Sequence, residues 1–159
     1  MKPAWMAFAA ALLVVVAPLS ADFAAGLAAY NKDDYAGALK EWKPLADGGS
    51  RDAQYNVALL YLDGKGVARN YDEALKWLQR AANQGQVEAQ HDLGASYGKG
   101  EIVKRDYVQA YKWLSLCAAK GNPGCATQRD LVEKKLKGSK LAEAQRQASE
   151  WKPVEEPSK

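Results

Sequence analysis

The chain has 159 residues, of which 48% are hydrophobic and 26% charged, and its formal net charge at pH 7 is +3. Positive and negative residues are mixed, and no basic face has the density that nucleic-acid binding requires. One histidine and two cysteines leave no set of three or four protein ligands for zinc. We therefore expect no metal, no cofactor and no nucleic-acid partner.

Residues 1–21 have the form of a secretory signal peptide. Lys2 supplies a positive start, residues 4–17 are apolar and uncharged, and a small-residue exit ends at Ala21. The alternative is a membrane anchor, but the apolar run is shorter than the roughly 20 residues that span a bilayer. We expect cleavage after Ala21, no stable membrane insertion afterwards, and a periplasmic or secreted protein of the bacterial envelope.

The rest of the chain repeats with a period of 36 residues. Gly49, Gly85 and Gly121 are spaced by this period, and many residue types between them recur in the same register. The matching pairs are Ala53 and Ala89, Gln54 and Gln90, Tyr61 and Tyr97, Gly64 and Gly100, Tyr71 and Tyr107, and Trp77 and Trp113. Such a period predicts stacked supersecondary units rather than one closed core.

Each unit is predicted to be a helix, a turn and a second helix. Ala53, Val57 and Tyr61 recur at the spacing that places side chains on one helix face, and the stretch DGKGVARN then interrupts the pattern. Tyr71 to Asn83 carries a broad apolar stripe. Small residues let neighbouring helices approach, and Trp77 is expected to fill the gap between repeats. The predicted fold class is all-α.

The third unit carries the most complete pattern. Its framework residues are Ala89, Leu93, Gly94, Tyr97, Gly100, Tyr107, Lys112, Trp113, Ala118 and Gly121. This pattern resembles the Sel1-like repeat, a relative of the tetratricopeptide repeat. The resemblance implies an α/α solenoid of three Sel1-like helix-turn-helix repeats plus a C-terminal capping helical hairpin. The repeats are a divergent one over 22–50, a second over 51–86 and a third over 87–121.

Beyond the third repeat the pattern dissolves. We interpret residues 122–151 as a degenerate repeat that caps the array, because Leu141, Ala144 and Trp151 lie on one stripe of a last helix with a polar opposite face. The stretch PVEEPSK that follows is rich in proline and charge. Residues 152–159 are therefore predicted to be a disordered tail.

Cys117 and Cys125 are the two cysteines, and seven residues separate them. In an oxidising compartment such a pair favours a disulfide over a redox motif or a metal site. The spacing is similar to that of the Helicobacter cysteine-rich proteins, a Sel1-repeat family in which such a bridge ties one helix to the next. The alternative is two buried free thiols.

The sequence contains no convincing set of catalytic residues. Ser96 and Lys99 match Ser-x-x-Lys, the nucleophile motif of penicillin-recognising serine enzymes, and residues 137–139 faintly resemble their later Lys-Thr-Gly. However, Tyr97 inside the motif belongs to the repeat framework. A weak cell-wall or β-lactam hydrolase is the second hypothesis, and no catalytic residue is assigned.

The first hypothesis is a non-enzymatic adaptor or scaffold for a protein or peptide partner of the cell envelope or of a host. In solenoids of this kind the first helices line the concave side, and positions outside the framework point into the groove. The candidate partner-binding residues are Asn31, Asp52, Tyr55, Leu59, Leu62, Glu88, His91, Ala95 and Lys99. The alternative is contact elsewhere, for instance on the convex face or at Trp151.

Overall fold

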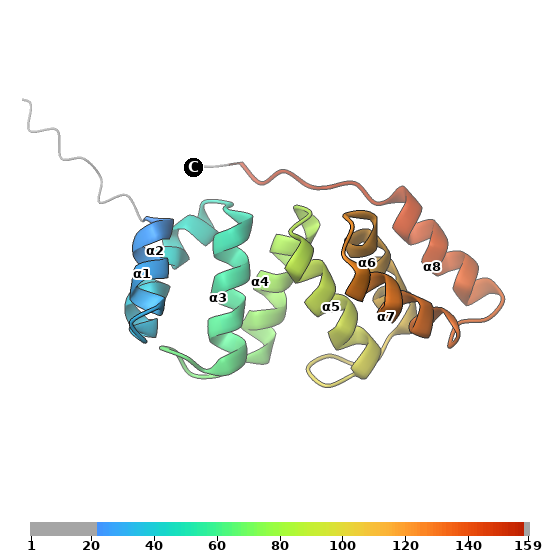
Figure 1. Ribbon diagram of the computed structural model, residues 1–159, viewed down its shortest axis with the longest axis horizontal. Helices are drawn as coiled ribbons and strands as arrows, with labels where there is room; N and C mark the ends of the chain where they lie inside the picture. Colours follow the sequence, from blue (N-terminus) through green and yellow to red (C-terminus); the bar gives the residue numbers. More distant parts are fainter. Residues whose placement is uncertain (1–21, 158–159) are drawn as a thin grey trace, which may run out of the picture.

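A computed structural model describes residues 22–157, and this part of the chain forms eight α-helices and no strand (Figure 1). The helices are α1 (Phe23–Tyr30), α2 (Tyr35–Asp47), α3 (Arg51–Asp63), α4 (Tyr71–Asn83), α5 (Val87–Lys99), α6 (Tyr107–Ala119), α7 (Pro123–Glu133) and α8 (Ser139–Glu150). The predicted all-α solenoid is confirmed. The expected signal peptide, residues 1–21, lies outside the described residues.

From α1 to α7 the helices pack in chain order, each against the next along the array. Figure 1 shows α1 to α7 side by side in a row, with α8 at the C-terminal end. Helix α8 packs on α6, and its Ala144 is fully buried there in a cluster with residues of α6 and α7. The last two helices thus cover the open face of the third repeat.

The sequence period reappears as a repeated geometry at the helix ends. Ser50 and Gln86, one period apart, each accept a hydrogen bond from the backbone N–H three residues on and so cap α3 and α5. Gly64 and Gly100 end the same two helices with φ of 67° and 73°, a left-handed conformation that favours glycine. The same residue types therefore start and stop corresponding helices.

A buried tryptophan lies in the second helix of each repeat. Trp42, Trp77 and Trp113 are between 1% and 2% exposed. Two clusters make up the buried core, one built mainly from α2 to α5 and the other from α6 to α8. Trp113 belongs to the first cluster, although the other buried residues of its helix, such as Ala110, belong to the second. Its ring therefore packs against the preceding repeat, as we expected for residues filling this gap.

A disulfide joins Cys117 of α6 to Cys125 of α7, with 5.8 Å between the two Cα atoms. Both residues are fully buried. The bridge that the spacing predicted is therefore present in the structure. It holds α7 against α6 at the point where the repeat pattern ends.

The C-terminal tail differs from our expectation. Residues 151–157 run back over the array as an extended segment (Figure 1). The backbone N–H of Val154 donates to the carbonyl of Asn83 at 2.8 Å, and Glu156 forms an ion pair with Arg80. The prediction of a disordered tail is wrong for residues 152–157, because composition alone did not reveal these partners.

Helices α5 and α6 approach each other closely at Gly94. A Cβ atom added there would lie 2.6 Å from Leu114 Cγ and 3.2 Å from the Leu114 backbone nitrogen, so the helices would have to separate. We expect Gly94→Ala to lower the free energy of unfolding by about 1–2 kcal/mol. Urea unfolding followed by circular dichroism measures this change.

The matched control is Gly98→Ala on the same helix. A Cβ at Gly98 would lie at ordinary contact distance, 3.8 Å, from Ala110 and Val132. Alanine is the better helix former, so this variant should gain up to about 1 kcal/mol. Equal stability of the two variants would contradict the close approach.

Candidate partner-binding surface

The first helices of successive units, α3, α5 and α7, present one row of side chains that we call the A-helix face. We define it by Asp52, Tyr55, Leu59, Leu62, Glu88, His91, Asp92, Ala95, Lys99, Gln128 and Leu131. Of the predicted binding residues, Asp52, Glu88 and Lys99 are exposed. Asn31, also exposed, ends α1 in the first unit.

The remaining predicted residues are half-buried. They are Tyr55, Leu59, Leu62, His91 and Ala95. Tyr55 and Leu62 also pack against the buried core, so their apolar atoms are only partly open to a partner.

A chain of hydrogen bonds crosses the A-helix face. The hydroxyl of Tyr55 donates to Asp92 Oδ2 at 3.1 Å, His91 Nδ1 lies 3.0 Å from Asp92 Oδ1, and Gln128 Nε2 lies 3.0 Å from His91 Nε2. An amide nitrogen only donates, so this arrangement leaves the imidazole proton on Nδ1, which donates to Asp92. We call these four residues the polar ladder. It links α3, α5 and α7 and fixes the side chains between them.

The polar ladder follows the repeat period. Tyr55 contacts Asp92 and His91 contacts Gln128, each pair being 37 residues apart. A residue on one first helix thus meets the next unit one position beyond its own counterpart. Tyr55 and His91 were among the predicted binding residues, whereas Asp92 and Gln128 were not, although the period offset by one residue indicates them.

Burial raises the pKa of Tyr55, and the nearby carboxylate of Asp92 raises it further. Both effects disfavour the phenolate, because it would be poorly solvated and would face a negative charge. The phenol therefore remains a hydrogen-bond donor to Asp92 throughout the physiological pH range.

An apolar pocket of about 240 Å³ lies beside the polar ladder, between α5, α6 and α7. Its lining residues are Gly94, Ala95, Gly98, Lys99, Tyr107, Leu114, Gln128, Leu131, Val132 and Lys135. Leu131 is 57% exposed, and the two lysines of the lining, Lys99 and Lys135, are exposed as well. The pocket thus combines an apolar lining with two positive charges. Of the lining residues, Ala95 and Lys99 were among the predicted binding residues, and Leu131 was not.

The Ser-x-x-Lys match has a structural use within its own helix. The hydroxyl of Ser96 donates to the backbone carbonyl of Asp92 at 2.6 Å, one turn earlier. Tyr97, between the two motif residues, is half-buried and packs against both core clusters. These contacts give Ser96 and Tyr97 a structural role within α5.

Between residues 22 and 157, no cluster of three or more His, Cys, Asp or Glu side chains is arranged to hold a metal ion. The same part of the chain contains no helix that is long and apolar enough to cross a bilayer.

The polar ladder predicts an unusual tyrosine titration. In the wild-type protein Tyr55 should ionise above the ordinary tyrosine pKa of 10.0. Asp92→Asn should lower the pKa of Tyr55 but leave it above the ordinary value, because burial is the larger cause. NMR observation of the tyrosine Cζ resonances during an alkaline titration measures both values. A Tyr55 pKa unaffected by Asp92→Asn would show that the two side chains do not interact.

Comparisons with known proteins agree with this architecture. The family model for the Sel1 repeat matches residues 51–86 and 87–122. The chain is similar to the crystal structure of c5321, a protective antigen present in uropathogenic Escherichia coli strains displaying an SLR fold. The sequence identity is 31% and the TM-score is 0.73. The match covers 79% of this chain and 28% of that one.

A Sel1 repeat protein from Oxalobacter formigenes is also similar. It is 30% identical with a TM-score of 0.57, over 70% of this chain and 87% of that one. No curated protein matches the chain. The repeat models, the solved structures and the helical array agree, and the chain belongs to the Sel1 repeat family.

Proposed function

We propose that this protein is a non-enzymatic interaction scaffold that binds a segment of a partner protein on the A-helix face. Sel1 repeats generally mediate protein interactions. The observation that carries the proposal is the apolar pocket between α5 and α7, with Leu131 exposed at its edge. The side chains beside this exposed apolar pocket are already held by hydrogen bonds. They therefore lose little conformational freedom when a partner docks.

The pocket favours a partner segment of defined chemistry. Its volume and apolar lining suit one medium-sized apolar side chain as an anchor. Lys99 and Lys135 at the same pocket favour acidic residues beside that anchor, because complementary charge steers association and fixes the register. The binding segment is therefore an extended peptide or loop with an apolar residue flanked by acidic ones.

The same proposal places the protein outside the cytoplasm, in the periplasm or beyond. Its support is the disulfide between Cys117 and Cys125, since such bridges persist in oxidising compartments. The apolar character of residues 1–21 is a second support from the sequence.

Site-specific photo-crosslinking tests the binding surface. A crosslinker is introduced in whole cells at position 131 in one variant and, as the control, at position 71 in another, since Tyr71 on α4 is also exposed, at 42%, but lies outside the A-helix face. Crosslinks from position 131 should map to a partner segment with an apolar residue flanked by acidic residues. Crosslinks to the same partner from position 71 alone would move the site elsewhere.

Binding of the mapped segment to purified protein then measures the contribution of the pocket. We expect Leu131→Glu to weaken binding of the synthetic segment at least tenfold, because the substitution places a negative charge in the apolar pocket. This corresponds to a loss of about 1.4 kcal/mol or more in binding free energy. Tyr71→Ala should leave the affinity unchanged. Equal affinities for wild type and Leu131→Glu would rule out the pocket as the site.

A further inference from the structure

The C-terminal tail lies on a surface that shares no residue with the A-helix face. We call this surface the tail strip and define it by Gly49, Gln54, Arg80, Asn83 and Gly85. Figure 1 shows the extended segment after α8 passing back across the ends of the preceding helices toward α3. These residues belong to four elements, namely the α2–α3 turn, α3, the end of α4 and the α4–α5 turn.

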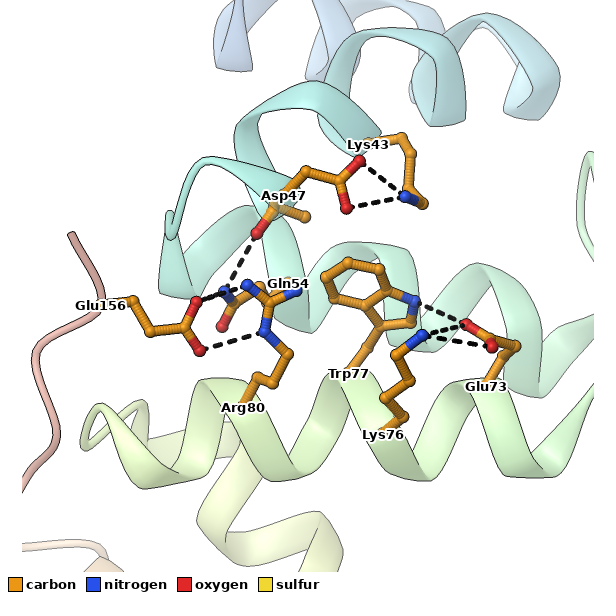
Figure 2. A network of polar contacts seen from close by, with 9 residues as sticks. Lys43, Asp47, Gln54, Glu73, Lys76, Trp77, Arg80 and Glu156 are labelled. Atoms are coloured by element: carbon orange, nitrogen blue, oxygen red, sulfur yellow. Dashed lines mark hydrogen bonds and ion pairs between the residues drawn. The ribbon is translucent and has the colours of Figure 1, made fainter. Parts of the chain in front are cut away.

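The side chain of Glu156 is bound by a forked pair of donors (Figure 2). Arg80 donates from Nε to Oε1 at 3.0 Å and from Nη2 to Oε2, and Gln54 Nε2 donates to Oε2 at 2.9 Å. The hydrogen bond from Arg80 is the main reason that the pKa of Glu156 is lowered. The two charged side chains are only 29% and 23% exposed, so the pair is better shielded than an ordinary surface ion pair.

The groups that bind the carboxylate are held in place by the array itself. The guanidinium of Arg80 lies 4.7 Å from the ring centroid of Trp77, which is buried. Gln54 also donates to the backbone carbonyl of Ala46 at 3.0 Å and accepts from Gln84 at 2.8 Å. None of these contacts involves the tail, so the donors are already oriented for a carboxylate.

No carboxylate of the array bonds to Arg80 in place of Glu156. The charge of Asp47 on α2 acts on Arg80, but both oxygens of Asp47 accept hydrogen bonds from Lys43, at 2.8 and 2.7 Å (Figure 2). Arg80 would therefore be a shielded cation without a hydrogen-bonded partner if Glu156 were removed. The site is complete only with an added carboxylate.

The backbone of the tail is recognised as well. Val154 donates its N–H to the carbonyl of Asn83, the last residue of α4, where a helix leaves carbonyls open. A Cβ at Gly49 would lie 3.2 Å from Glu156 Cβ, so the missing side chain gives the tail room. Pro153 and Pro157 flank this stretch and restrict the segment toward extended conformations.

Of the two matched repeats, only the second carries this carboxylate-binding site. Gln90, one period after Gln54, makes the corresponding hydrogen bond to the carbonyl of Ala82 at 3.1 Å. The position corresponding to Arg80 is Leu116, which carries no charge. The framework glutamine thus recurs, and the cation that binds a carboxylate is added only in the second repeat.

We propose that the tail strip is a binding site for an extended acidic peptide, which residues 153–157 of the same chain occupy in the free protein. The recognised pattern is a backbone N–H followed two residues later by a glutamate, with prolines on both sides. A segment of another molecule with this pattern binds only by displacing the tail. The tail competes strongly, because a tethered segment has a high effective concentration.

The first experiment tests occupancy by the tail in the full-length chain. Amide exchange of Val154 should be at least tenfold slower than in an unstructured peptide, because its N–H is bonded to Asn83. Glu156→Gln and Arg80→Met should each remove most of this protection. The matched control is Glu155→Gln, a change at the exposed neighbouring glutamate, which should keep it. Unprotected Val154 in the wild type would overturn the proposal.

The second experiment tests binding in trans. The synthetic peptide KPVEEPSK is titrated into full-length Glu156→Gln, whose own tail is released, and the side-chain NMR signals of Gln54 and Arg80 are followed. We expect the peptide to shift both signals, with no shift when its second glutamate is replaced by glutamine and an unchanged shift when its first is replaced. No shift at millimolar peptide, or equal shifts with all three peptides, would contradict a site specific for this glutamate.

Discussion

The second and third repeats are each stabilised by a buried tryptophan that contacts the preceding repeat. Trp77 and Trp113 occupy the same position in successive units and are almost fully buried. Trp113 belongs to the core cluster of the preceding helices rather than to that of its own helix. A single helical hairpin would leave this apolar surface in water, so the hairpins are stable as an array. The two proposed binding surfaces depend on this stacking, because they are formed between units.

The fold was predictable from the sequence because the period and the packing have the same cause. Residues that recur every 36 positions make the same contact in each unit, so Trp77 and Trp113 are buried alike and Gly64 and Gly100 end their helices alike. The disulfide was predictable from the spacing of the cysteines together with the expected oxidising compartment. The tail was not, since its contact with Arg80 joins residues 76 apart in sequence and belongs to no period.

The candidate site was predictable only in part, for a related reason. Tyr55 and His91 followed from their place on the first helices, but each bonds to a residue of the next unit offset by one position. Leu131 lies in the degenerate unit, where the register no longer indicates which side chains face outward. The two surfaces differ in origin. The A-helix face follows the repeat period, whereas the tail strip depends on Arg80, which does not recur in the next repeat.

Native-state hydrogen exchange of Trp113→Ala tests the stacking most directly. Since Trp113 joins the two core clusters, we predict a loss of about 3–5 kcal/mol in opening free energy that reaches both α4 and α7. Leu131→Ala, at an exposed position, serves as the control and should change little. A Trp113→Ala protein that loses less than about 1 kcal/mol, or loses protection in α6 to α8 alone, would contradict the account.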